Sequence, residues 1–487
     1  MTCNTTQRLP RRLLMRLALL CALPFAFTST AAETGGADTA TAQTMRLDYL
    51  HTGDAKTQHY ALDRIVIEPL PWPGNPARPI DDSNRGHNKF EVLDASTGTL
   101  LYSRGFSTVF AEWRTTEEAG TLSRGFQESL RFPVPAAPVT VRIYERDAAN
   151  AFAQVWSIDV DPAALTIERK TMPSPLKPVA IRDNGPSAQK VDLLILGDGY
   201  TQADTDKFIA AARRLSDHLF NVSPFKERAA DFNVWALMAP TPESGISRPS
   251  TGDHHASALG TRYDIFGSER YVLAMDNRAL REIAQYAPNE FIEILVNNQT
   301  YGGGGIFGQF STAAADNAFA DYLFVHEFGH HFAGLADEYY TSPVAYAPTE
   351  AKVEPWEPNV TALHDLAQLK WRNHVRAQTP VPTAWPKAEY EARQRKFQKT
   401  RAQLRADNRP ESEMEDLFRA ELAYTNKLFA DAPYKLAVGA FEGANYAATG
   451  YYRPQMQCLM FDRSDVFCQV CHDAVEETID LYSRPAP

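Results

Sequence analysis

The sequence predicts an α+β protein, with an N-terminal β-sandwich domain followed by a domain built on a mixed, mainly parallel sheet. Two observations lead to this prediction. Between residues 44 and 169, short apolar stretches are separated by Pro and Gly turns, which is typical of sandwich strands. After a Pro-rich linker at residues 170–189, continuous apolar runs alternate with helical patterns. This alternation over residues 190–487 indicates strands that are buried on both faces.

The composition is that of a globular protein. The 487 residues are 44% apolar and 11% aromatic, which excludes a disordered chain, and this length has room for two or three domains. The formal net charge is −11 and no long basic stripe is present, which argues against nucleic acid as a partner. Five cysteines are too few for a disulfide-built scaffold, but three of them crowd together near the end of the chain.

Residues 1–32 are expected to be a secretory signal peptide. Four arginines lead into an apolar run at residues 17–27, and small residues follow, with cleavage expected after Ala31 or Ala32. The protein is therefore expected to be exported, to the periplasm or to the medium. The apolar run is too short to span a bilayer. No other segment reaches about 18 consecutive apolar residues, so we expect no stable membrane span.

Within the N-terminal domain, residues 90–95 and 99–106 flank a Ser-Thr-Gly turn and predict a β-hairpin. Residues 139–144 alternate apolar and polar side chains, as a half-buried strand does. No group of residues in this domain points to catalysis, and we interpret its histidines as structural.

In the second domain, buried strands are predicted at residues 191–196, 232–238 and 291–296, with a helix at residues 204–220 after the first of them. Residues 385–430 are strongly charged and predict two helices. We interpret this pair as an insertion within the second domain, with its charges facing solvent.

Four consecutive glycines, Gly302, Gly303, Gly304 and Gly305, follow the last of these strands. Two interpretations are open. The glycines form a flexible loop, or they form an edge strand whose bare backbone pairs with a peptide substrate.

The strongest functional signal is the pattern His326-Glu327-x-x-His330. On a helix the two histidines lie about 6 Å apart along the axis on one face, where both imidazoles can bind one zinc ion. Glu327 is then placed to take a proton from water and to return it to a leaving amine.

A catalytic zinc needs a third protein ligand. Gly334 can end the helix in a left-handed turn and send the chain back towards the metal. Asp337 is the predicted third ligand, and Glu338 is the alternative. His331 points away from His330 on the helix, and a structural role is expected for it.

These residues resemble the metzincin zinc peptidases, and more closely the bacterial IgA-peptidase family of metallopeptidases. The motifs that carry the resemblance are residues 196–201, 326–339, 441–444, 452–454, 458–460 and 467–471. The resemblance implies a metzincin-like zinc peptidase domain with an active-site helix, in a secreted or periplasmic protein. One difference from metzincins is that the glycine and the third ligand come one residue later here.

The resemblance also assigns Met460 to the methionine turn, an apolar floor beneath the zinc. Tyr451 or Tyr452 is a candidate donor to the oxyanion of the tetrahedral intermediate. Ordinary packing is the alternative for all three residues.

Cys458, Cys468 and Cys471 leave three interpretations open. We favour a structural disulfide between Cys458 and either of the others, which leaves one thiol over and agrees with the resemblance. The sequence Cys468-x-x-Cys471-His472 also spells a c-type haem attachment pattern. A second metal site is the third interpretation.

The sequence thus predicts an exported zinc-dependent endopeptidase that acts on a protein or peptide substrate, with Glu327 as general base. The alternatives are a non-catalytic zinc-bearing module that binds glycoprotein, and a c-type haem protein. The natural substrate, the role of the N-terminal domain and the oligomeric state do not follow from the sequence.

Overall fold

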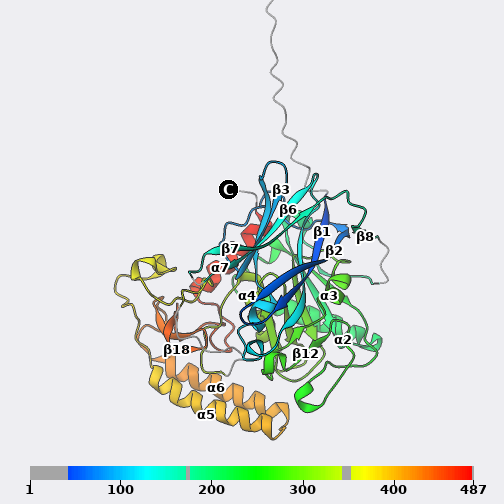
Figure 1. Ribbon diagram of the computed structural model, residues 1–487. Coiled ribbons are helices and arrows are strands. Elements are labelled where there is room, and N and C mark those ends of the chain that lie inside the picture. Colours follow the sequence, from blue (N-terminus) through cyan, green and yellow to red (C-terminus); the bar gives the residue numbers. More distant parts are fainter. Residues whose placement is uncertain (1–41, 148, 172–175, 343–352, 485–487) are drawn as a thin grey trace, which may run out of the picture. The chain divides into compact units, whose positions relative to one another are not determined.

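The structure is a computed structural model that describes residues 42–147, 149–171, 176–342 and 353–484 (Figure 1). It is a mixed α and β protein, as predicted. The predicted signal peptide lies outside the described residues. Each helix within the described ranges is too short or too polar to cross a membrane.

Two four-stranded sheets form the N-terminal domain, with the orders β5-β1-β2-β8 and β4-β3-β6-β7. Their strands are β1 (Gln43–Gly53), β2 (Gln58–Pro71), β3 (Asn88–Asp94), β4 (Leu100–Phe106), β5 (Arg124–Pro133), β6 (Val139–Arg146), β7 (Phe152–Val160) and β8 (Glu168–Arg169). The predicted hairpin is confirmed, because β3 and β4 pair antiparallel. The two sheets bury a shared core, to which β1 contributes Met45 and Leu47 and β3 contributes Phe90 and Val92.

The second domain is built on a six-stranded sheet with the order β15-β16-β14-β10-β11-β9. Its strands are β9 (Val179–Arg182), β10 (Val191–Asp198), β11 (Phe232–Met238), β14 (Phe291–Val296), β15 (Gly303–Ile306) and β16 (Phe310–Ala314). The central neighbours are parallel, whereas both edge strands run antiparallel to their neighbours. Every residue of β10 and β14 is buried, which explains the continuous apolar runs in their sequences.

Strand β9 changes the interpretation of the predicted linker. It lies inside the range 170–189, yet Val179 and Ala180 pair with Ala236 and Trp235 of β11. Part of the predicted linker is therefore an edge strand of the second domain.

Helix α4 (Ala320–Ala333) is enclosed on nearly all sides: of its residues only Asp321 and His330 are partly exposed. It packs against β15 and β16, and also against α2 (Thr205–Leu219) and α7 (Gln469–Ser483) (Figure 1). Close packing on several elements holds the side chains of α4 in fixed positions.

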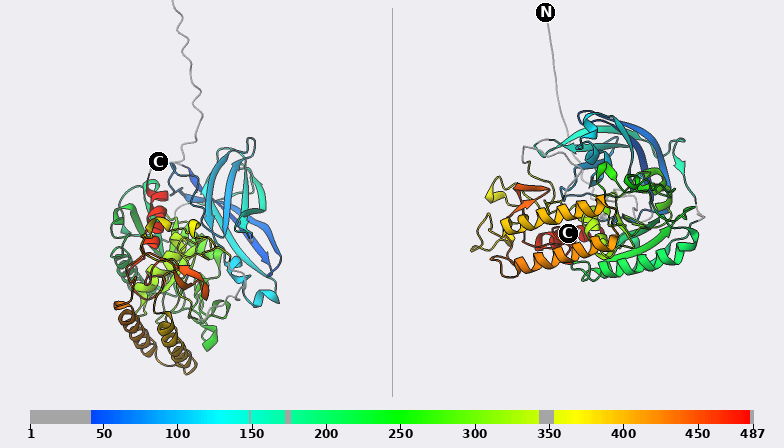
Figure 2. Two further views of the ribbon diagram at one scale, coloured as in Figure 1. Left: turned by 90° about the vertical axis from the view of Figure 1, so that its left-hand side faces the viewer. Right: turned by 90° about the horizontal axis from the view of Figure 1, so that it is seen from below.

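The charged segment forms two helices, α5 (Lys387–Ala406) and α6 (Glu411–Ala430), which lie side by side (Figure 2). The predicted helical pair is confirmed, but not all of its charges face solvent, because Arg401 and Glu421 are buried together with apolar side chains. Phe418 of α6 packs edge-on against Tyr301, with ring centroids 4.9 Å apart. The remaining short elements are α1 (Val109–Trp113), β12 (Thr261–Arg262), β13 (Leu273–Ala274), α3 (Asn277–Ala284), β17 (Phe441–Ala444) and β18 (Ala447–Arg453).

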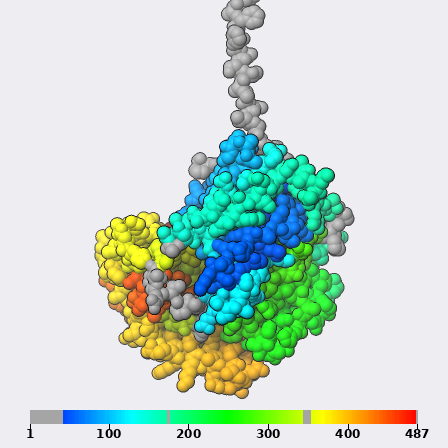
Figure 3. All heavy atoms as spheres, in the orientation of Figure 1, coloured from blue at the N-terminus to red at the C-terminus, as the bar shows by residue number. Residues whose placement is uncertain are grey.

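The N-terminal sheets contact the second domain through buried charged side chains. Arg46 of β1 is fully buried and donates to Glu282 at 2.9 Å. Arg85 donates to the carbonyl oxygens of Ala333, at the end of α4, and Ala474, in α7. In Figure 3 the blue and cyan atoms of the N-terminal sheets accordingly lie directly against the green atoms of the second domain.

Candidate metal centre and substrate cleft

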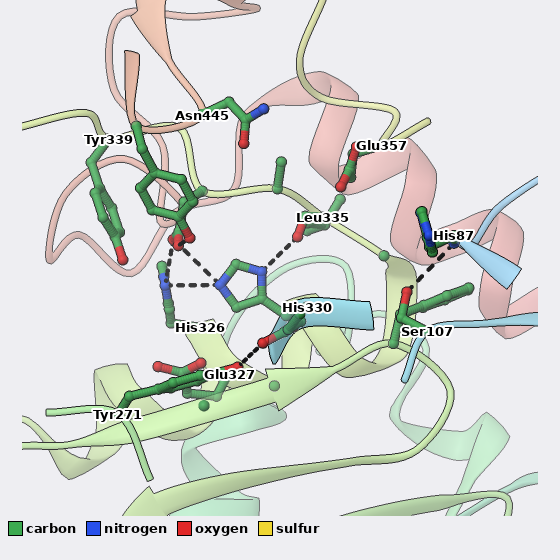
Figure 4. A pocket seen from close by; sticks show the side chains of 18 of the residues that line it. His87, Ser107, Tyr271, His326, Glu327, His330, Leu335, Tyr339, Glu357 and Asn445 are labelled. Carbon is green, nitrogen blue, oxygen red and sulfur yellow. Dashed lines mark hydrogen bonds and ion pairs between the residues drawn. The ribbon is translucent and has the colours of Figure 1, made fainter. Parts of the chain in front are cut away.

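Helix α4 carries His326 and His330 on one face, one turn apart, as their spacing predicts. Their Nε2 atoms are 3.2 Å apart, and both side chains line a cleft (Figure 4). Nδ1 of His326 lies 3.1 Å from the carbonyl oxygen of Leu459, and Nδ1 of His330 lies 2.6 Å from that of Leu335. Because a carbonyl oxygen only accepts, each Nδ1 is placed to donate its proton to it, and this tautomer would leave each Nε2 with a lone pair for a metal.

Asp337 reaches the two histidines because the chain turns back after α4. Gly334 ends the helix in the left-handed conformation, with a φ of 63°. Asp337 Oδ1 lies 3.1 Å from Nε2 of His326 and 3.3 Å from Nε2 of His330. The carboxylate of Glu338 lies instead among the three cysteines, so the geometry favours Asp337 as the third ligand.

These three atoms fit a zinc ion. Ligand atoms about 2.0–2.1 Å from a tetrahedral zinc are separated by about 3.3–3.4 Å. The separations in the protein are 3.1–3.3 Å. Asp337 Oδ1 is buried and faces the ring nitrogens of both histidines, where a cation would be bound by all three atoms. Two imidazoles and a carboxylate are also a donor set of catalytic zinc sites.

Glu327 lies beside the histidines and lines the same cleft (Figure 4). Burial raises the pKa of Glu327, while the neighbouring His326 and His330 act in the opposite direction. A carboxyl group with a pKa closer to neutrality can accept a proton and return it, as general acid–base chemistry requires.

A second buried carboxyl group, Glu293 in the central strand β14, was missed by sequence reasoning. It is fully buried and receives a hydrogen bond from Ser311 of β16. Burial, reinforced by the charge of Glu327, raises the pKa of Glu293 well above its ordinary range. The available signal was an acidic residue in the middle of an otherwise apolar strand.

The glycines at positions 302–305 are not a flexible loop, because three of them belong to strand β15. A Cβ atom on Gly303 would lie 2.9 Å from Cγ of Glu327. A Cβ atom on Gly305 would lie 2.8 Å from Cβ of His330. The glycines therefore allow the backbone of β15 to approach α4 closely.

The outer edge of β15 is only partly covered. Gly303 exchanges two backbone hydrogen bonds of 3.1 Å with residues 270–272, and the carbonyl oxygen of Phe307 accepts from the N–H of Ser107 at 2.9 Å. Backbone groups of alternate residues point to the same side of a strand. Gly305, midway between these contacts, therefore directs its N–H and C=O outwards.

The cleft has a volume of about 700 Å³ and is lined by both domains. The N-terminal domain contributes His87, Ser107, Thr108, Ala111, Glu112 and Thr115. The hydroxyl of Tyr271 donates to Glu112 of α1, and this bond links the N-terminal domain to the segment beside β15. Sequence reasoning missed this wall of the cleft.

Of the two predicted tyrosines, Tyr451 lines the cleft and Tyr452 does not. The hydroxyl of Tyr451 donates to the carbonyl oxygen of Val353 at 3.1 Å. Because Tyr452 is not among the residues that line the cleft, the geometry gives no support to an oxyanion role for it. Tyr446, which sequence reasoning missed, donates from its hydroxyl to Oδ2 of Asp337.

Met460 lies against α4: a Cβ atom on Gly329 would come within 3.2 Å of its sulfur. The carbonyl oxygen of Met460 accepts from the N–H of Glu338 at 2.9 Å. His331 has the structural role expected of it, because its ring bridges Ile292 of β14 and Ile306 of β15.

The three cysteines are buried free thiols and not the predicted disulfide. Sγ of Cys458 and Sγ of Cys471 are 3.7 Å apart, whereas a disulfide bond measures about 2.05 Å. Cys468 and Cys471 are 3% and 0% exposed within the main core. Attachment of a haem needs accessible thiols, so the geometry also argues against the haem interpretation.

Comparison with protein families agrees with this geometry. The model of the family described as IgA Peptidase M64 matches residues 179–479. A second model, described as Peptidase M64 N-terminus, matches residues 37–157. Together the two matches cover most of the chain and confirm the resemblance to IgA peptidases. No protein with a curated description matches the chain.

Proposed function

Because the chain belongs to the M64 family of IgA peptidases, we propose that it is an exported, zinc-dependent endopeptidase. The observation that carries the proposal is the convergence of His326 Nε2, His330 Nε2 and Asp337 Oδ1 to within 3.1–3.3 Å of one another. This donor set lies in a cleft that also holds Glu327. Export is proposed from the signal-peptide pattern in residues 1–32.

His326, His330 and Asp337 would hold the zinc ion. When bound there, zinc supplies a Lewis acid that polarises a carbonyl group and acidifies water. Glu327 accepts the proton of the attacking water and passes it to the nitrogen of the leaving amine. The carbonyl oxygens of Leu459 and Leu335 fix the orientation of the two imidazoles throughout this cycle.

Tyr446 acts as a positioning residue in this scheme. Its hydroxyl donates to Oδ2 of Asp337 and so leaves Oδ1 facing the histidines. Hydrogen bonds of this kind orient metal ligands and raise metal affinity.

We place the substrate along the outer edge of β15, as an added strand. The outward-facing N–H and C=O of Gly305 would pair with its backbone. Contacts with residues 270–272 on one side and with Ser107 on the other restrict this open edge. Because so little edge is free, side-chain contacts with both walls of the cleft would contribute much of the selectivity.

The test is the substitution Glu327→Gln, which keeps the size of the side chain but removes the base. Loss of general acid–base catalysis lowers rates by about 10²–10⁴-fold. We expect a fall of this size in cleavage of a peptide library by the full chain, with the zinc content unchanged. Cleavage by the variant at the wild-type rate, or a wild-type protein purified without zinc, would contradict the proposal. Terminal sequencing of the protein recovered from the periplasm or medium tests export.

A further inference from the structure

Four buried side chains outside the catalytic centre bring their ligand atoms together. Each of Glu338, Cys458, Cys468 and Cys471 offers one such atom, and all four atoms lie within 4.8 Å of one another. Sγ of Cys458 and Sγ of Cys471 are 3.7 Å apart. Glu338 Oε1 is 3.3 Å from Sγ of Cys471 and 3.7 Å from Sγ of Cys468.

From this arrangement we propose that Cys458, Cys468, Cys471 and Glu338 form a second, structural zinc site. Sulfur atoms about 2.3 Å from a tetrahedral zinc lie about 3.75 Å apart, close to the 3.7 Å found here. Four protein ligands leave no position open, which is typical of structural rather than catalytic zinc. On binding, each thiol loses its proton to solvent, and the thiolates and the carboxylate bind the cation.

The surrounding backbone is arranged to stabilise thiolates. The N–H groups of Cys468 and Met460 point at Sγ of Cys458, at 3.2 and 3.5 Å. The N–H of Cys471 points at Sγ of Cys468, at 3.5 Å. Cys468 is also the N-cap of α7, where the positive end of the helix dipole favours negative charge.

A disulfide would not explain why the side chain of Glu338 is buried beside the three cysteines. Its side chain is fully buried, Oε2 has no hydrogen-bond partner among the described residues, and Oε1 accepts from Asn359 at 3.0 Å. A buried carboxylate is costly without a compensating cation. The charge of the buried Arg453 also acts on Glu338. Joining two of the three thiols would nevertheless leave Oε2 of Glu338 without a hydrogen-bond partner among the described residues, and one thiol over. A zinc ion uses all four groups.

This site would stabilise the catalytic centre through the chain that they share. Glu338 directly follows Asp337, and its N–H donates to the carbonyl oxygen of Met460 at 2.9 Å. Cys458 lies two residues before Met460 and accepts from its N–H. A cation held by Glu338 and Cys458 would therefore fix the segment that presents Asp337 to the histidines.

The first experiment measures metal and thiols on the wild-type full chain and on a His326→Ala/His330→Ala variant. We expect two zinc ions per chain in the wild type and one in the variant. X-ray absorption of the variant should show sulfur neighbours of zinc at about 2.3 Å. Mass spectrometry after denaturation and alkylation without reductant should find three free thiols. A disulfide-linked peptide, or a metal-free variant with intact fold, would overturn the proposal.

A second comparison separates the two sites by adjacent conservative substitutions. Glu338→Gln should remove the sulfur-bound zinc and leave the histidine-bound ion, whereas Asp337→Asn should do the reverse. Val466→Ala, at an exposed position nearby, is the matched control and should keep both ions. The assignment would also be contradicted if Asp337→Asn lost both ions while Glu338→Gln kept both. Because the readout is metal identity and not activity, failure here leaves the endopeptidase proposal standing.

Discussion

Two buried ligand clusters lie next to each other in this protein and differ in their access to solvent. The histidine centre opens into a cleft of about 700 Å³ and offers three ligand atoms. The cysteine cluster offers four, all from buried residues. Asp337 and Glu338, adjacent in the chain, each serve one of them. Solvent access and the number of protein ligands therefore distinguish the two clusters. An open site with three ligands is suited to catalysis, whereas a closed site with four is suited to holding the fold.

Metal removal gives the largest expected contrast between the two clusters. A zinc chelator should abolish peptidase activity, because the histidine centre is open to the cleft. The cysteine cluster should keep its ion, because its ligands are buried. Peptide cleavage, zinc content after desalting and thiol alkylation are measured together over time. Thiols that become reactive as fast as activity disappears would show that the two clusters do not differ in access.

A smaller effect is expected from Tyr446→Phe, which removes the hydrogen bond to Asp337. Loss of such a supporting contact lowers metal affinity by about 10–100-fold. Zinc titration against a competing chelator should show this fall at the histidine centre alone. Tyr452→Phe is the control, because Tyr452 lies outside the residues that line the cleft. Equal losses in both variants would remove Tyr446 from its positioning role.

The smallest effect concerns packing, because the histidine centre depends on β15. In Gly305→Ala the new Cβ would lie 2.5 Å from the carbonyl oxygen of Glu327 and 2.8 Å from Cβ of His330. Overpacking of this kind costs about 1–3 kcal/mol in the free energy of unfolding. Gly120→Ala, where no atom lies within 4 Å of the new Cβ, should cost less. Denaturant unfolding compares the two variants, and equal costs would mean that β15 tolerates a side chain.

The sequence predicted the parts of the fold that depend on local pattern. The strands expected at residues 232–238 and 291–296 match the bounds of β11 and β14. Strands buried on both faces are mostly apolar, so the change to polar residues on either side marks where they end. The histidine pair on α4 was predictable for a similar reason, because helical spacing alone places His326 and His330 on one face.

Features that depend on distant contacts were not predictable. Spacing cannot decide between Asp337 and Glu338, because the chain after Gly334 has no regular period. Tyr446 is joined to Asp337 across 109 positions of sequence. The hydrogen bond between Tyr271 and Glu112, in the wall of the cleft, joins residues 159 positions apart. No local sequence pattern around these residues predicts the contacts.

Arg85 gives the N-terminal domain a direct part in the catalytic scaffold. Its guanidinium donates to the carbonyl oxygen of Ala333, where α4 ends, and to that of Ala474 in α7. A cation at this position satisfies a helix-end carbonyl and offsets the negative end of the α4 dipole. The N-terminal sheets thus act as an external cap for the helix that carries His326 and His330. Cutting the chain between the domains would uncap that helix as well as remove a wall of the cleft.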